Sequence, residues 1–208
     1  MHTEAASPLV AERQRRTWTQ IHQAAAAAAA EHGPDDVTVA TIAAEAGISP
    51  RTFFNYFESK EDAIVGVQAP RLTDEALAEL RESADLPPIV RVSRLVTSVA
   101  TTTIGPGVDL AQRRALARSH PRLQARLTQV FTEARKLVLS RMVEDVDSPW
   151  PGVAGLPSDL NESRALVLLA GAVVTLAWTT DPDFYHRDRD DSLDAVIATF
   201  RKVTSTAL

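Results

Sequence analysis

The sequence has no cysteine among its 208 residues, and only 5% of them are aromatic. The absence of cysteine excludes disulfides, thiolate nucleophiles and cysteine-ligated zinc sites. The sequence also lacks a Gly-x-Ser-x-Gly elbow, a phosphate-binding loop and the paired histidines of a zinc site. We therefore expect no enzyme activity, no catalytic residues, no metal and no cofactor.

A long hydrophobic run is also missing. The longest uncharged apolar stretch, residues 165–180, is shorter than the ~20 residues that span a bilayer. Residues 1–11 include Glu4 and Pro8 and have no apolar core of signal-peptide length. We expect a cytoplasmic protein that does not contact a membrane.

Positive charge is scarce as well. The formal net charge is −5, and residues 1–60 contain five basic and seven acidic side chains. This balance argues against a protein that coats DNA through charge alone. The balance is compatible with a sequence-specific DNA-binding protein, because such a protein needs basic groups only at the positions that contact phosphates.

Helical signals dominate the sequence, and strand signals are nearly absent. Residues 24–30 are consecutive alanines, and alanine has the highest intrinsic helix propensity. Helix ends are marked by prolines, by apolar periodicity and by caps at Thr38 and Ser49, and Ser59 and Asp62 form a predicted capping pair. The predicted helices span residues 13–32, 39–46, 50–57, a short stretch from 59, 72–83, 89–103, 110–119, 121–146, 159–180 and 190–204. The sequence therefore predicts an all-α fold.

The segment from Thr38 to Lys60 has the pattern of a helix-turn-helix, whose second helix enters the major groove. Two short predicted helices flank Gly47. Close packing of such helices needs a small residue on the first helix, here Ala43, and apolar side chains on both. The apolar set is Ile42, Ala46, Ile48, Phe53 and Tyr56. The N-terminal part is therefore predicted to be a three-helix DNA-binding domain.

The side chains left on the outer surface of the second of these helices suit contacts to DNA. Arg51 can bind guanine or a phosphate, Thr52 can contact a phosphate or a thymine methyl, and Asn55 can bind adenine or the DNA backbone. Lys60 lies at a helix start, where phosphates bind. We expect these four residues to touch DNA.

Between about residues 13 and 65 the chain carries a specific succession of residues: Thr38-Val39, Ile42-Ala43, Ala46-Gly47-Ile48-Ser49, Thr52-Phe53-Phe54-Asn55-Tyr56-Phe57 and Ser59-Lys60-Glu61. This succession closely resembles the N-terminal domain of the tetracycline-repressor-like (TetR) family. The rest of the chain resembles that family in helix pattern and length alone. What the resemblance implies is a homodimeric, ligand-responsive transcriptional regulator, usually a repressor.

The resemblance also implies which residues meet DNA. Position by position, the family's phosphate and base contacts fall on Thr38, Ser49, Pro50, Arg51, Thr52, Phe54, Asn55, Tyr56 and Lys60. The chain departs from the family pattern in the first helix, where Ala28 and Ala29 stand in place of large residues. We expect a thinner core there, with Trp18, Phe53 and Phe57 filling the space.

Three arginines open the first predicted helix. Arg13, Arg15 and Arg16 follow residues 1–12, which we predict to be a flexible arm. Basic arms reach phosphates or the minor groove in other DNA-binding proteins, and a solvated charge cluster is the alternative. We include the three arginines among the predicted DNA contacts.

Residues 13–58 are thus predicted to be the DNA-binding domain and residues 59–208 a helical ligand-binding and dimerisation domain. The helix predicted over 159–180 is apolar all round from Ala165 onward, and such a helix is buried on every side. We expect it to pair with the amphipathic helix of residues 190–204 and with both helices of a second copy. A homodimer would present two recognition helices to a palindromic operator in double-stranded DNA. A large monomeric core is the alternative.

A pocket for a small-molecule effector is expected between the helices of residues 72–146 and the apolar helix. Its candidate lining residues are Leu127, Val130, Phe131, Val174 and Trp178, with plain core packing as the alternative for each. The stretches 112–114, 120–123 and 49–54 resemble the actinobacterial branch of the TetR family that responds to acyl-coenzyme-A esters. The resemblance implies a largely apolar effector, with an acyl-coenzyme-A ester as one candidate.

Two other classes of protein are alternatives: a helical enzyme, and a helical scaffold that does not bind DNA. The best candidate for an enzyme site is the tract from Asp181 to Asp191, in which five carboxylates and a histidine could gather a divalent cation. A solvated loop between two helices is the other interpretation of that tract. A scaffold would not be retained on any duplex, whereas a regulator would bind DNA tightly, selectively and in a salt-sensitive way.

Overall fold

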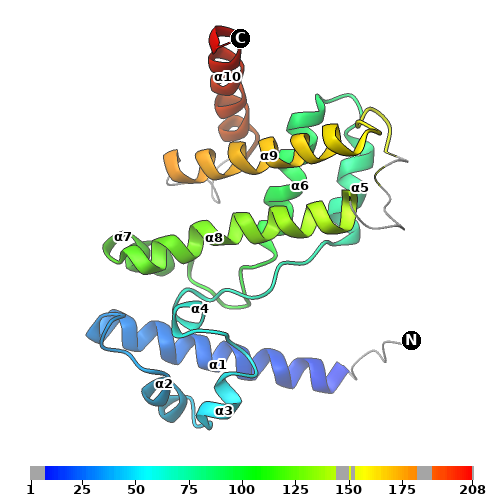
Figure 1. Cartoon of the computed structure of the whole chain (residues 1–208). Coiled ribbons are helices and arrows are strands. Elements are labelled where there is room, and N and C mark those ends of the chain that lie inside the picture. The colour runs from blue at the N-terminus through cyan, green and yellow to red at the C-terminus, as the bar shows by residue number, and fades with distance from the viewer. Residues whose placement is uncertain (1–7, 144–149, 151–152, 182–188, 208) are drawn as a thin grey trace. The chain divides into compact units, whose positions relative to one another are not determined.

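The computed structural model of the chain (Figure 1) describes residues 8–143, 150, 153–181 and 189–207. The named elements in these ranges are all helices, apart from one isolated antiparallel bridge between Val67 and Ile104. The predicted all-α fold is confirmed. The chain forms two compact units: Met1–Gln68 with Ile104–Leu127, and Ala69–Thr103 with Thr128–Leu208. The predicted division into residues 1–12, 13–58 and 59–208 is a functional one, and it remains a prediction.

The first unit is built around a long helix, α1. Figure 1 shows α2 and α3 lying along one side of it, and α4 also packs against it. The elements of this unit are α1 (Pro8–His32), α2 (Val39–Glu45), α3 (Pro50–Phe53), α4 (Lys60–Val65), α7 (Leu110–Ser119) and the first residues of α8 (Pro121–Val138). The predicted helix-turn-helix is α2 and α3.

Side-chain caps start the short helices of this unit. The hydroxyls of Thr38, Ser49 and Ser59 each accept a hydrogen bond from a backbone N–H three residues later. Such caps satisfy N–H groups that have no partner within the helix. Gly47, between α2 and α3, has φ +62°, a value that glycine adopts at little cost. The caps and the turn glycine were predicted from the sequence, and they are confirmed.

In this unit, α1 and α3 depart most from their predicted bounds. Helix α1 begins at Pro8, so residues 8–12 of the predicted flexible arm are helical. Proline is tolerated in the first helical turn, and Glu12 pairs with arginines three and four residues later. Helix α3 ends at Phe53 rather than at residue 57, because Asn55 and Tyr56 donate to carbonyls three residues back and close a tight turn.

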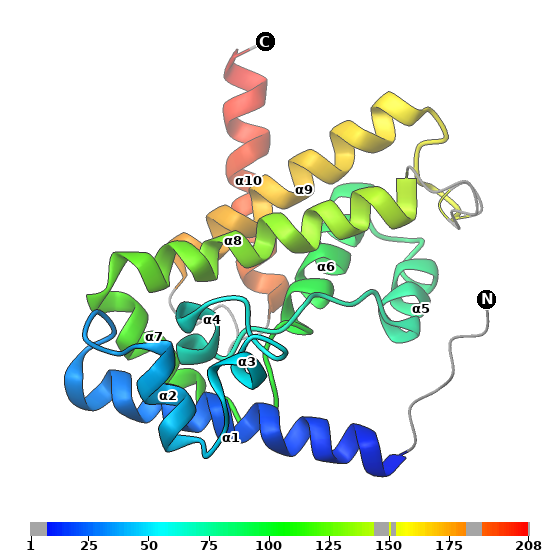
Figure 2. The ribbon, with the colours of Figure 1, turned by 60° about the horizontal axis from the view of Figure 1, so that its bottom comes forward.

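The second unit contains the other helices. These are α5 (Asp74–Glu82), α6 (Pro88–Thr101), the later part of α8, the π-helical turn η1 (Leu139–Val143), α9 (Leu160–Thr180) and α10 (Arg189–Ala207). Helix α9 packs against both α6 and α10, and Figure 2 shows α10 crossing α9. The core between them holds Val92, Val96, Val173 and Val174, all fully buried. The predicted helix over 121–146 keeps α-helical geometry only to Val138.

Helix α9 is long and apolar enough to cross a membrane by length and composition alone, and 39% of its most apolar window is buried. A core helix of a soluble protein passes the same test. Its outer face carries Leu168 and Leu169, which are 47% and 41% exposed. The composition of α9 predicts burial on every side, but within one chain this outer face is exposed.

Candidate DNA-binding site

Helix α3 presents a polar and aromatic surface to solvent. The hydroxyl of Ser49 accepts from the Thr52 N–H at 3.1 Å, and Pro50 occupies the first helical position. Below the helix Phe53 is fully buried, whereas Arg51 is exposed. The local fold therefore turns Arg51 outward by burying Phe53.

Phe54 and Asn55 extend this surface. Phe54 is 59% exposed, and its ring stands edge-on to Phe53, with the ring centroids 5.4 Å apart and the planes at 87°. Asn55 is exposed as well, although it lies in the turn after α3. The edge contact holds Phe54 in one orientation, because aromatic pairs prefer this geometry.

The predicted hydroxyl contacts have partners within the domain. Thr38 and Thr41 form a reciprocal cap, with N–H to hydroxyl distances of 3.0 and 3.1 Å. The hydroxyls of Ser49 and Thr52 lie 2.9 Å apart. Thr38 and Ser49 are exposed, and Thr52 and Tyr56 are half-buried. These residues line the starts of α2 and α3 and the turn after α3, where they lie near the outer surface.

An aromatic cluster supports α3 from below. The Trp18 and Phe57 ring centroids are 5.0 Å apart, and those of Phe53 and Phe57 are 5.8 Å apart. Trp18, Phe53 and Phe57 are all buried, and Ala29 of α1 is 2% exposed. The three rings therefore form one buried cluster, and the prediction that they fill the space left by the alanines of α1 stays a prediction.

Lys60 is the first residue of α4, as predicted, and its side chain is held within the domain. Its ammonium group donates to the carbonyls of Pro34 at 2.9 Å, Val37 at 2.8 Å and Asp35 at 3.3 Å. An ammonium group has three N–H donors, and here each has a carbonyl acceptor in the loop between α1 and α2. The geometry gives Lys60 the role of closing that loop, and its predicted phosphate contact stays a prediction.

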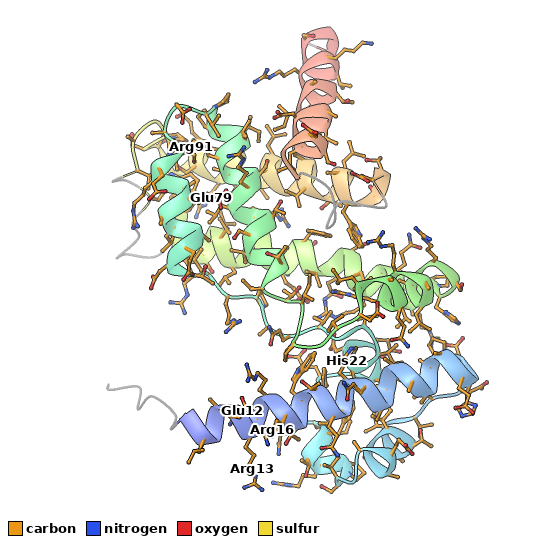
Figure 3. All side chains as sticks on the ribbon, turned by 180° about the vertical axis from the view of Figure 1, so that it is seen from behind. Glu12, Arg13, Arg16, His22, Glu79 and Arg91 are labelled. Carbon is orange, nitrogen blue, oxygen red and sulfur yellow. The ribbon has the colours of Figure 1, made fainter. Side chains whose placement is uncertain are left out.

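The three N-terminal arginines lie on the first turns of α1 and not on a flexible arm. Arg15 and Arg16 both pair with the carboxylate of Glu12, and hydrogen bonds from Arg16 and then Arg15 lower the pKa of Glu12. Arg13 is exposed, and Figure 3 shows it extending from α1 on the side where α3 lies. Arg13 is thus the member of this group best placed to act with Arg51.

A buried histidine joins α1 to α4. His22 is 4% exposed, its Nδ1 lies 2.8 Å from the Ala63 carbonyl, and its ring lies 5.5 Å from that of Trp18. Burial lowers the pKa of His22, the bond to the Ala63 carbonyl opposes this, and the charge of Arg113 adds to the lowering. The neutral ring with its proton on Nδ1 is therefore the form that fits this site.

An ion pair joins α4 to the start of α8. Arg126 Nε donates to Asp62 at 2.5 Å, and the two side chains are only 16% and 8% exposed. Ser59 also donates to this carboxylate at 2.8 Å. The sequence predicted Ser59 and Asp62 as a capping pair, but no local pattern indicated the contact with Arg126, which lies 64 residues away in the sequence.

The predicted effector residues are mostly core. Leu127, Val130, Phe131 and Val174 are buried, and Trp178 is half-buried with its ring 5.5 Å from that of Phe131. Leu127 belongs to the first unit, and the other four belong to the second. Two described cavities, of about 790 and 530 Å³, have other linings. The effector role of these residues remains a prediction.

The acidic tract at residues 181–191 lies mostly outside the described residues. Among the residues that are described, no group of three or more histidine, aspartate or glutamate side chains could hold a metal ion.

Comparison with known proteins adds to this geometry. The model of the family "Bacterial regulatory proteins, tetR family" matches residues 21–64. Among solved structures, the chain is similar to the fatty acid degradation regulator FadR from Bacillus halodurans, with 18% identity over 93% of this chain and 94% of that chain and a TM-score of 0.36. At this distance the similarity indicates nothing about a ligand. No curated protein matches the chain.

Proposed function

The chain belongs to the tetR family of bacterial regulatory proteins through its N-terminal domain, and on this premise we propose that it is a ligand-responsive repressor that binds a palindromic operator as a homodimer. That it is a DNA-binding transcriptional regulator follows from the family, and membership favours a protein that is not an enzyme. The repressing role, the symmetry of the operator, the effector and a cytoplasmic location belong to the proposal.

The outward side of α3 is the observation that carries the proposal. Arg51, Phe54 and Asn55 are exposed while Phe53 beneath them is fully buried. Arg51 provides the bidentate donor that recognises guanine, and Asn55 provides the donor and acceptor that recognise adenine. Phe54 gives an apolar edge for a thymine methyl.

The contacts to phosphates come from the rim of this surface. We assign them to Thr38, Ser49, Thr52 and Tyr56 and to the exposed backbone at Pro50. Arg13 adds charge from α1, while Arg15 and Arg16 can join it only by giving up part of their pairing with Glu12. Because phosphate contacts set orientation and base contacts set sequence, Arg51 and Asn55 are the residues that decide which operator is bound.

The exposed apolar face of α9 supports the homodimer. Leu168 and Leu169 lie three and four residues after Ala165, which places these exposed side chains on one face of the helix. Val203 on α10 is 60% exposed. Contact with the same two helices of a second copy would remove this apolar surface from water, and the two-fold axis would present two α3 helices to one duplex.

An effector would act by stabilising one arrangement of this dimer. A ligand shifts such an equilibrium only as far as its affinities for the two states differ. The Asp62–Arg126 pair ties α4 to α8, so a displacement of α8 would be passed to the helix that packs on α1. The effector we propose is small and largely apolar, with an acyl-coenzyme-A ester as one candidate.

Selection of bound duplexes from a random pool tests this function. We expect an inverted repeat whose half-sites lie about one helical turn apart, and the Arg51→Ala variant should lose preference at one base pair of each half-site. Retention of no sequence above background at physiological salt would instead support a helical scaffold. A single non-repeated site would contradict the dimer and leave DNA recognition intact.

A further inference from the structure

A groove lies between α1 and α2 in the first unit. Its volume is about 790 Å³, and its floor includes Ala24, Ala27 and Ala28 of α1 and Val37, which precedes α2. The three alanines are three and four residues apart, so they lie on one face of α1. Ala27 is exposed, and Ala24 and Ala28 are half-buried. The groove is open to solvent because methyl side chains fill little of the space beside α2.

Carboxylates border the groove. Glu31, Asp36 and Glu45 all line it, and all three are exposed. Within the described ranges Asp36 and Glu45 have no ion pair, and Glu31 pairs only with His32, at 3.8 Å. The His32 ring is charged only when it is protonated. No arginine or lysine of the described chain therefore compensates the negative charge of this rim.

The first turns of α1 form a projecting end. Figure 1 shows this end extending past α2 and α3. The side chains of residues 9–16 are exposed, apart from the half-buried Glu12. Leu9 is 82% exposed and Val10 is 48% exposed. Helices in proteins gain most of their stability from packing an apolar face, and here two apolar side chains lie in water at the tip of a helix.

This end of α1 is complementary to the groove in charge. Residues 8–16 contain three arginines and one glutamate, which gives a net charge of +2. The three carboxylates of the groove give −3 with His32 neutral. Leu9 and Arg13 are four residues apart and share one face of the helix. That face offers an apolar tip and a cation, and the groove offers an apolar floor and an acidic rim.

A chain cannot fill its own groove with this end. Leu9 and Ala27 both belong to α1. The 18 residues from position 9 to position 27 separate them by ~27 Å along a straight helix. An occupant with this chemistry must therefore come from another molecule of the protein.

We propose that the first turns of α1 of one copy dock in the α1–α2 groove of a second copy. Leu9 and Val10 lie on the alanine floor, where their apolar surface leaves water, and Arg13 lies beside the acidic rim. A patch that fits a pocket elsewhere on a second copy makes a heterologous contact. Arg13 cannot face this rim and a DNA phosphate at once, so the contact belongs to the protein free of DNA.

The inference goes beyond the proposed function, because the homodimer proposed there uses α9 and α10 and this contact uses the first unit alone. Its test is made without DNA and without an effector. A failure of this contact and a failure to bind an operator are therefore distinguishable.

Chemical crosslinking of the full-length chain tests the proposal, and the absence of natural cysteine makes it site-specific. The Ala11→Cys, Gln23→Cys double variant has one thiol on the projecting end and one beside the groove, both at exposed positions. These positions are ~18 Å apart on α1, so a short bismaleimide that cannot span this distance joins them only between copies. We expect linked pairs of chains well above the yield of either single variant.

The control pair moves the second thiol away from the groove. Ala115 is exposed on α7 in the same unit, and the Ala11→Cys, Ala115→Cys variant should give no more linked chains than the single variants do. If the groove pair links no better than this control pair, the proposal is overturned, and the groove is left to a cationic ligand of another kind.

Further changes in the groove pair test which surfaces meet. Ala27→Trp fills the groove and should abolish linking, whereas Ala30→Trp, at an exposed alanine of α1 that does not line the groove, should leave it unchanged. Leu9→Asp should lower the yield about ten-fold or more, although an aspartate in the first turn favours the helix. Glu45→Lys should lower it about two- to five-fold. Equal yields from the two tryptophan variants would overturn the proposal.

Hydrogen exchange on the unmutated protein gives a second test that does not require variants to fold. Docking covers the first turns of α1, so the amides of residues 12–16 should exchange more slowly as the protein concentration rises. The amides of α7, which lies outside the contact, serve as the internal control. Exchange at residues 12–16 that does not depend on concentration would overturn the proposal.

Discussion

Replacement of Lys60 by methionine separates two roles that this residue could have in a DNA-binding domain. Its ammonium group donates to the carbonyls of Pro34, Asp35 and Val37. Hydrogen bonds to charged groups contribute ~1.5–3 kcal/mol each. The two shorter bonds dominate, and water replaces part of the third because Asp35 is exposed. We therefore expect the free energy of unfolding of the first unit to fall by ~3–6 kcal/mol.

The assay uses Trp18 fluorescence during urea unfolding, with Trp150 and Trp178 replaced by phenylalanine so that the signal comes from the first unit alone. On the same protein, the slope of log Kd for an operator duplex against log salt counts phosphate contacts. Lys60→Met should leave that slope unchanged under conditions in which the protein is folded. Arg51→Met is the matched control: because Arg51 is exposed, its loss should change stability by less than ~0.5 kcal/mol and weaken operator binding.

The opposite pattern would refute the reasoning. If Lys60→Met unfolds at the same urea concentration as the unmutated protein and its salt slope falls by about one, then Lys60 binds a phosphate and does not close the loop.

Three further changes test the packing and the assembly. Leu168→Glu, on the exposed face of α9, should convert the dimer to a monomer in light scattering, and a dimer of unchanged stability would place the interface elsewhere. Gly105→Ala would put a Cβ 1.9 Å from the Trp18 ring, so thermal unfolding should show a loss of ~1–3 kcal/mol from overpacking; an unchanged midpoint would contradict this contact. Burial lowers the pKa of His22 in spite of its bond to Ala63, so the unfolded state takes up the proton first. The contribution of His22 to the free energy of unfolding should be complete above pH ~6.5. Below that pH it should decline by at most ~1.4 kcal/mol per pH unit until the folded-state pKa is passed. A pH series of urea titrations measures this decline, which the His22→Gln variant should lack.

The parts of the fold that could be predicted are those set by neighbours in the sequence. Caps at Thr38, Ser49 and Ser59 depend on residues three positions away, and they occur as expected. The helix predicted over 110–119 has those bounds. Side-chain identity and periodicity over one or two turns contain this information, because the interactions involved are themselves local.

Contacts between distant residues could not be predicted in the same way. Lys60 was expected to bind a phosphate because a cation at a helix start suits that role, yet its partners lie 23 to 26 residues earlier in the chain. The burial of Arg91 could not be predicted either, since the carbonyl of Ala154 that accepts its hydrogen bond lies 63 residues away in the sequence. A single sequence gives no sign of which backbone carbonyls will surround a given cation.

The extension of α1 to Pro8 shows a smaller limit of the same kind. The basic residues after position 12 resemble a disordered arm, but pairing of Glu12 with Arg15 and Arg16 favours helix at those positions. Either state is compatible with the composition, and a few tenths of a kcal/mol per pair decide between them.

Photo-crosslinking from position 54 tests most directly whether the outer side of α3 meets DNA. A benzophenone side chain in place of Phe54, which is 59% exposed, should crosslink to a base within each half-site of a selected operator, and the same group in place of Leu168 should not. Bound protein that crosslinks no better from position 54 than from position 168 would contradict DNA recognition by α3.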